Sequence, residues 1–217
     1  MLIQEALNLL TPQLTALGWV ERFGGVTRRV TMPFGDGSGG TIQKAFPISC
    51  SVTEADCNNN QRYQDLVPDS DKKSLLYWEV TRELADQGAA LNENRRSLRG
   101  SARLVGWLNT DKLGVNECNA AAKAARSILP ILYTKFDNGG GNAIFENANI
   151  RFQFSGGSIK DKAVFERYDY GKDPDGFLLH PYDFFALDVE VFVILPLCGY
   201  TFTTGAEIIC IDDSKLL

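Results

Sequence analysis

Hydrophobic residues near the start of the chain recur with helical spacing. Intervals of four and three residues separate Ile3, Leu7, Leu10, Leu14 and Leu17, which places them on one side of a helix. Thr11-Pro12 interrupts this segment. Because proline has no amide donor, we expect either a kink or a new helix that starts with Thr11 as its cap. Gly18 is predicted to end the helix.

Alternation of apolar and polar residues predicts several strands. The alternating or extended segments are 19–32, 41–53, 75–82, 97–108, 150–154, 187–195 and 200–211. Within 75–82 the pattern puts Leu76 and Trp78 on the inner face and Tyr77 and Glu79 on the outer face. Pro47 cannot donate to a ladder, so the strand around it is expected at an edge or at a bulge.

A second helix is predicted over 117–136, with Asn116 or Asn119 as its cap and a kink at Pro130. Polar or glycine-rich loops are expected at 33–40, 54–73, 83–95 and 137–142. The order of elements predicts an α+β fold in which an antiparallel or mixed sheet is flanked by two main helices. We expect one domain, 1–217, with a loop-rich insertion around 33–99.

Composition narrows the class of protein. The chain has 217 residues, a hydrophobic content of 44% and a net charge of -5, so a dedicated nucleic-acid binder with a basic surplus is disfavoured. No apolar run approaches the roughly 18 residues of a membrane span, and the start lacks the features of a signal peptide. No two cysteines form a CxxC pair, which favours reduced thiols made in a cytoplasm. The five cysteines are Cys50, Cys57, Cys118, Cys198 and Cys210.

The search for catalytic chemistry favours a protein that is not an enzyme. His180 is the single histidine, and no serine or cysteine beside it stands in a nucleophile setting, so a structural or surface role is favoured. The glycines of 35–40 are not followed by the Gly-Lys-Ser/Thr of a phosphate loop. Asp173 and Asp175, with Asp183 and Asp188, do not match a calcium loop and are expected to be solvated. We therefore predict no catalytic residue, no metal site and no cofactor.

One basic cluster is the best candidate for a contact surface. It contains Arg95, Arg96, Arg99 and Arg103. A solvated face is one explanation, and a rim that meets an acidic neighbour is another, since arginine suits contacts with carboxylates. Direct DNA contact ranks third. The candidate subunit interface comprises Arg95, Arg96, Arg99, Arg103, Asp183, Asp188 and Glu190.

Long loops and tyrosines that the pattern places on the surface also favour assembly. Unstructured loops of such length usually carry function, and tyrosine is enriched at protein interfaces. The tyrosines expected at the surface are Tyr77, Tyr168, Tyr170 and Tyr182.

Three segments carry a resemblance to a known family. They are the opening helix 2–17 with Gly18-Trp19-Val20, the strand 103–108 before the helix 117–136, and the late strand 181–191. Their order resembles that of head–tail joining and tail-terminator proteins of tailed bacteriophages, with the crAss-like phages of gut bacteria as the nearest group.

The resemblance implies a virion structural protein without catalytic residues, located in the virion and made in the host cytoplasm. Its copies would form a homo-oligomeric ring between portal and tail, in contact with portal, connector and tail proteins. DNA would pass through the lumen without sequence-specific binding. The basic segment 95–103 would meet the acidic segment 183–190 of the next copy, because ring contacts join two different faces.

Two other classes of function stay open at this point. One is a different virion or secretion-type assembly protein, such as a tail tube or capsid-associated protein. The other is a small hydrolase that uses aspartate or glutamate. No membrane partner is expected.

Overall fold

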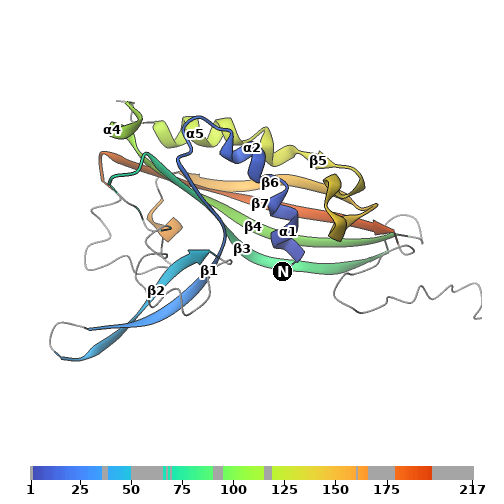
Figure 1. Cartoon of the computed structure of the whole chain (residues 1–217), viewed down its shortest axis with the longest axis horizontal. Helices are drawn as coiled ribbons and strands as arrows, with labels where there is room; N and C mark the ends of the chain where they lie inside the picture. The colour runs from blue at the N-terminus through green and yellow to red at the C-terminus, as the bar shows by residue number, and fades with distance from the viewer. Residues whose placement is uncertain are drawn as a thin grey trace, which may run out of the picture.

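A computed structural model describes most of the chain. The described residues are 2–35, 39–49, 66, 68, 70–89, 95–114, 119–159, 161–165 and 179–196. Within them, seven strands form one sheet in the order β2-β1-β3-β4-β7-β6-β5. The main α-helices lie over one face of this sheet (Figure 1).

The strands are β1 (Arg22–Gly35), β2 (Thr41–Ser49), β3 (Ser74–Ala89), β4 (Arg95–Asn109), β5 (Lys135–Phe136), β6 (Asn149–Ile159) and β7 (Tyr182–Pro196). The α-helices are α1 (Leu2–Asn8), α2 (Thr11–Thr15), α4 (Thr110–Leu113) and α5 (Ala120–Ile128). Short 3-10 helices are η2 (Ile131–Tyr133), η3 (Asn138–Gly141), η4 (Ala143–Phe145) and η5 (Lys162–Phe165). The α+β class is confirmed. The sheet is mixed, because β1 runs parallel to β3 and the other neighbours are antiparallel.

The centre of the sheet is the pairing of β4 with β7. It runs in unbroken antiparallel register from Arg95 opposite Pro196 to Asn109 opposite Tyr182. Since side chains alternate along a strand, one set faces the helices. This set is apolar over most of the length and forms the main core with α1, α2 and α5.

A second, smaller core covers only one end of the opposite face. Its members gather near the Asn109 end of β4 and are Leu66, Leu75, Tyr77, Val105, Trp107, Val164, Phe165, Phe184 and Ala186. Tyr77 is therefore buried, and our prediction that it lies at the surface was wrong. Glu79, also expected on the outer face, is buried as well. The simple alternation failed here because residues distant in sequence cover the second face.

The N-terminal segment follows its predicted pattern. Ile3, Leu7, Leu10 and Leu14 are fully buried, and the helix is interrupted where Thr11-Pro12 predicts it. Thr11 is the first residue of α2 rather than its cap, and Leu10 at the cap position makes no side-chain hydrogen bond.

Other boundaries differ from the prediction. β3 and β4 extend through much of 83–95, which we expected to be a loop. The pairing of β3 with β4 continues through residues that are mostly polar and only partly buried or exposed, so the hydrophobic pattern did not reveal it. The second helix is shorter than predicted: α5 ends at Ile128, and a 3-10 turn follows Pro130. The predicted strand 200–211, most of the loop 54–73, all five cysteines, Asp173, Asp175, Tyr168 and Tyr170 lie outside the described residues.

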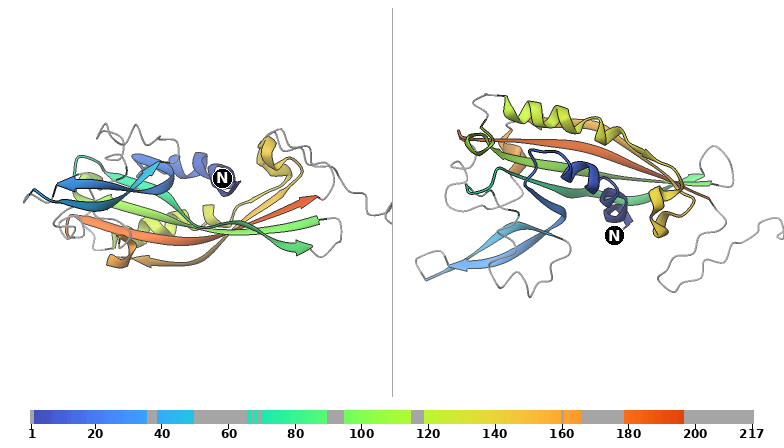
Figure 2. Two further views of the ribbon diagram at one scale, coloured as in Figure 1. Left: turned by 90° about the horizontal axis from the view of Figure 1, so that it is seen from below. Right: turned by 45° about the horizontal axis from the view of Figure 1, so that its top comes forward.

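The hairpin of β1 and β2 leaves the body of the sheet. β1 pairs with β3 only between Arg22 and Thr27, and from Thr27 to Gly35 it pairs with β2. A bulge separates Phe23 from Val26, and Gly25 there has a φ of 67°, a conformation that favours glycine. The hairpin therefore projects beyond the other strands (Figures 1 and 2).

A substitution at Gly106 tests how β4 packs against Phe185 of β7. A Cβ atom at this position would overlap the ring of Phe185, its direct partner on β7, and that ring is fully buried. We predict that Gly106→Ala lowers the free energy of unfolding by about 2 kcal/mol or more, as overpacked cores do. Urea denaturation would measure it. Gly156→Ala is the matched control, because a Cβ there meets no atom closer than 4.0 Å. Equal stability of the two variants would contradict the packing.

Candidate assembly surface

The part of the sheet face that the second core leaves uncovered carries a row of charged residues. Arg103 on β4 donates from Nε to Asp188 Oδ1 at 2.7 Å and from an Nη to Oδ2 at 3.4 Å. On its other side Arg103 stands opposite Glu79 of β3. The hydrogen bond with Asp188 raises the pKa of Arg103; burial acts against this, and the negative charges of Asp188, Glu79 and Asp161 add to the rise. Asp188 of β7 thus holds the guanidinium by hydrogen bonds, and Glu79 of β3 adds a negative charge nearby.

Further ion pairs continue along the same strands. Arg99 pairs with Glu190 of β7, and its guanidinium lies over the ring of Phe192 at 5.4 Å from the centroid. Between the two arginines, the Thr81 hydroxyl donates to Ser101 Oγ at 2.8 Å. Arg96 pairs with Asp86 of β3. We call the pairs Arg103–Asp188 and Arg99–Glu190 the charge ladder.

The structure thus brings together most of the residues of the predicted interface, but within one chain. Arg99 and Arg103 meet the very acids, Glu190 and Asp188, that we expected to belong to the opposing face of another copy. Arg95 is exposed at the start of β4. The contact between copies stays a prediction, and it would have to be made by side chains that already have partners.

Asp183 plays a different part from the one expected. It is buried, and its Oδ2 accepts a hydrogen bond of 2.8 Å from the backbone N–H of Ala121. Asn119 occupies the cap position of α5 but makes no side-chain capping bond. A carboxylate from β7 therefore caps α5, where an unpaired helix N–H would otherwise be buried. A local sequence pattern could not reveal a cap that comes from 62 residues away.

A groove opens at the other side of the sheet, between the end of α2, the start of β3, α4 and α5. Its volume is about 380 Å³, and it is lined by Gly18, Trp19, Lys73, Leu108, Lys112, Leu113, Ala120, Lys123, Ala124 and Ser127. Three of these are exposed lysines and most of the others are apolar. We call it the lysine groove. Sequence reasoning missed it because its lysines are far apart along the chain.

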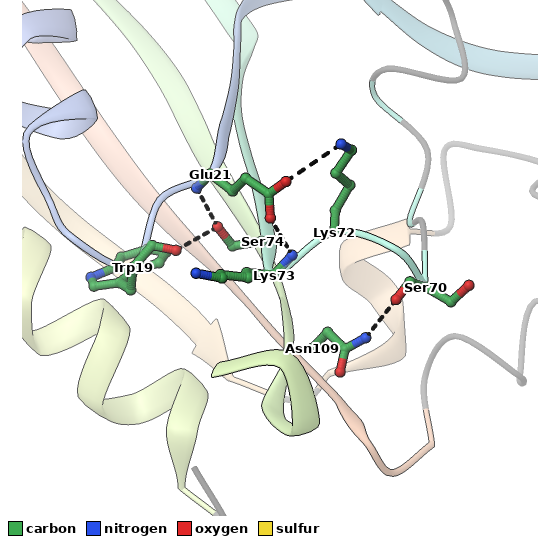
Figure 3. A network of polar contacts seen from close by, with 7 residues as sticks. All are labelled: Trp19, Glu21, Ser70, Lys72, Lys73, Ser74 and Asn109. Carbon is green, nitrogen blue, oxygen red and sulfur yellow. Dashed lines mark hydrogen bonds and ion pairs between the residues drawn. The ribbon is translucent and has the colours of Figure 1, made fainter. Parts of the chain in front are cut away.

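Hydrogen bonds fix the wall of the lysine groove. Ser74 Oγ donates to the Trp19 carbonyl at 2.7 Å and accepts from the Glu21 N–H at 2.9 Å (Figure 3). The Trp19 indole N–H donates to Ser127 Oγ at 3.1 Å. Trp19 is thereby held to β3 and to α5, and its ring also packs edge-on against Phe185.

Glu21 separates two neighbouring lysines. Its Oε2 accepts from the backbone N–H of Lys73 at 2.7 Å, and its Oε1 lies 3.4 Å from Lys72 Nζ. In Figure 3 the Lys72 side chain points to Glu21, whereas the Lys73 side chain points towards Trp19. The carboxylate is thus engaged with Lys72, and the charge of Lys73 is left on the side of the lysine groove.

Among the residues that the structure describes, no group of three or more His, Cys, Asp or Glu side chains is placed to hold a metal ion. His180 is exposed just before β7. No helix among the described residues is long and apolar enough to cross a membrane.

Comparisons of the sequence with protein-family models and with curated proteins find no match.

The Asp183 cap generates a stability prediction. Asp183→Ala should lower the free energy of unfolding by about 1–3 kcal/mol, because it leaves the Ala121 N–H buried without an acceptor. Asp183→Asn should cost less, since its amide oxygen can still accept. Urea unfolding would compare both with Asp111→Asn, an exposed aspartate of α4. Equal effects of the alanine variant and the Asp111 control would contradict the cap.

The Glu21 contacts generate a pH prediction. The hydrogen bond from the Lys73 N–H lowers the pKa of Glu21; burial opposes this, and Lys72 lowers the pKa further. Because the pKa is lower in the folded chain, the carboxylate stabilises the fold above its ordinary pKa, and this is lost as the pH falls through the folded value. Glu21→Gln should therefore lose less stability on acidification than the parent chain. Thermal unfolding from pH 7 to pH 3 measures this, with Glu146→Gln as the exposed control. A parallel loss in Glu21→Gln and the parent chain would count against the contact.

Proposed function

We propose that the protein is a virion structural protein of a tailed bacteriophage, a non-catalytic subunit of a homo-oligomeric head–tail connector ring between portal and tail. Its position in the virion would let DNA pass through the lumen without sequence-specific contact. The observation that carries the proposal is the projecting β1–β2 hairpin. The resemblance of the order of elements to head–tail joining and tail-terminator proteins supports the same function.

The hairpin has a physical reason to seek a partner. A two-stranded hairpin alone in water is at best marginally stable. Beyond Thr27, β2 is the only described strand that pairs with β1, and β2 itself lies at the edge of the sheet. Free edges of this kind invite strand addition or docking on another chain. An arm that reaches from each copy onto the next is a simple way to join subunits in a ring.

The charge ladder fits a surface along which DNA slides. Unpaired arginines bind phosphate and release counterions, which would hold the genome in place. Arg99 and Arg103 are neutralised by Glu190 and Asp188 in the same chain, and the whole chain has a net charge of -5. In the proposed ring this balanced, acidic character would let DNA pass.

Shortening the hairpin tests the proposal. Replacing residues 31–45 by Asn-Gly would join Val30 to Phe46, which are opposite each other in the hairpin, through a favoured two-residue turn. We expect the variant to keep its circular dichroism spectrum and to lose ring formation. The assay is electron microscopy and native mass spectrometry after co-expression with the proteins of neighbouring genes.

The parent chain is the control for the shortened variant. The parent chain, expressed alongside, should form rings of one copy number and should be found by mass spectrometry in purified particles. Absence of the parent chain from the particles would overturn the connector function. If the shortened variant formed rings equally well, the hairpin would not be what joins the subunits.

A further inference from the structure

The lysine groove concentrates positive charge on an acidic protein. Within the described residues, neither Lys73 nor Lys112 has an ion-pair partner, and the carboxylate of Glu21 is taken by Lys72. Lys123 adds a third ammonium group from α5. Ammonium groups gathered around one groove favour a ligand that carries carboxylates or other anions.

The walls of the groove add a second requirement. Leu108, Leu113, Ala120 and Ala124 make its surface largely apolar, and the Trp19 ring forms one side. Trp19 has its indole N–H satisfied by Ser127, so what it offers a ligand is mainly apolar contact. A volume of about 380 Å³ falls in the range of ligand sites, which is about 300–1,000 Å³. The groove therefore suits a segment in which acidic residues flank apolar side chains.

The chain itself contains such a segment. Residues 207–213 read Glu-Ile-Ile-Cys-Ile-Asp-Asp, with acidic residues on both sides of three isoleucines. They follow β7 and lie outside the described part of the chain. Both the charge and the apolar content of this sequence complement the groove.

Distance separates this segment from the groove of its own chain. β7 ends at Pro196, opposite Arg95, whereas Leu108 of the groove lies opposite Asp183 at the other end of the same pairing. The thirteen steps from Arg95 to Leu108 span about 43 Å at roughly 3.3 Å per residue. The eleven steps from Pro196 to Glu207 reach at most about 40 Å when the chain is fully extended. Glu207 thus reaches its own groove only if residues 197–206 are almost fully extended, whereas binding to a second copy sets no such demand.

We propose that the lysine groove binds residues 207–213 of a second copy of this chain. Lys73 and Lys112 pair with carboxylates of Glu207, Asp212 and Asp213, and the isoleucines cover the apolar surface beside them. The contact joins a groove at one end of the sheet to a segment that follows the other end, so it can repeat from copy to copy in the proposed ring. It rests on the proposed ring assembly and names one of its contacts.

Zero-length carbodiimide cross-linking tests this contact directly, because it joins lysine amines only to carboxylates that they touch. Full-length protein labelled with ¹⁵N is mixed with unlabelled protein, assembled and cross-linked. We expect mass spectrometry to find Lys73 or Lys112 joined to Glu207, Asp212 or Asp213 in pairs that combine both isotopes. Cross-links confined to one isotope, or groove lysines joined to another segment, would overturn the proposal.

Variants give a second measurement. Lys73→Gln with Lys112→Gln should weaken self-association at least tenfold in analytical ultracentrifugation. Lys72→Gln is the matched control, since Lys72 pairs with Glu21 and does not line the groove. Charge exchange, with Lys73→Glu and Lys112→Glu on one copy and Glu207→Lys and Asp212→Lys on the other, should restore association between those two copies.

The outcomes separate the two proposals. If the glutamine pair assembles as well as the parent chain, the groove contact is wrong while the ring stands. If the chain is absent from purified particles, the connector function is wrong, and the cross-links then decide the groove contact independently.

Discussion

The unbroken pairing of β4 with β7 is the constraint on which the rest of the structure depends. At the Asn109 end both faces of this pair are buried, and towards Arg95 only the helix face is. Gly106 makes the doubly buried end possible, because the Phe185 ring takes the space of its missing side chain. Trp19 packs edge-on against that ring and leads the chain from α2 into β1. The space left by Gly106 thus contributes to the position of Trp19 in the wall of the lysine groove, together with the hydrogen bonds to Ser74 and Ser127.

The charge ladder acts on the register of the same pair. A slip of one strand by one residue would turn either Arg103 or Asp188 to the helix face, away from its partner and among apolar side chains. Ion pairs that are partly buried contribute little net stability, because desolvation offsets their attraction, but they penalise wrong arrangements. We infer that the ladder specifies how β4 and β7 align, while the apolar residues of the other face supply most of the stability.

How far the sequence predicts this structure depends on the range of the interactions. Ile3 to Leu14 and the strand at 150–154 follow periodic patterns, and the structure has them as predicted. Tyr77 was misplaced because its cover comes from Leu66 and η5, which no local pattern connects to β3. The Asp183 cap and the three groove lysines were not predicted, for the same reason. Each depends on residues that only the folded sheet brings together, whereas the arginine cluster was visible because its members are neighbours in the sequence.

The two ends of the sheet differ, and this difference bears on how copies can associate. The lysine groove lies near α4, and β7 ends at the opposite end of the sheet (Figure 1). In a dimer that placed two lysine grooves face to face, the lysines would repel. A contact between unlike ends avoids that repulsion and can be repeated by every copy. Such contacts close into a ring when the rotation between copies divides a full turn and otherwise extend into a filament. If both ends of the sheet are engaged in such contacts, the hairpin would set the rotation between neighbouring copies. It leaves the sheet at Thr27 and reaches beyond the body of its own chain.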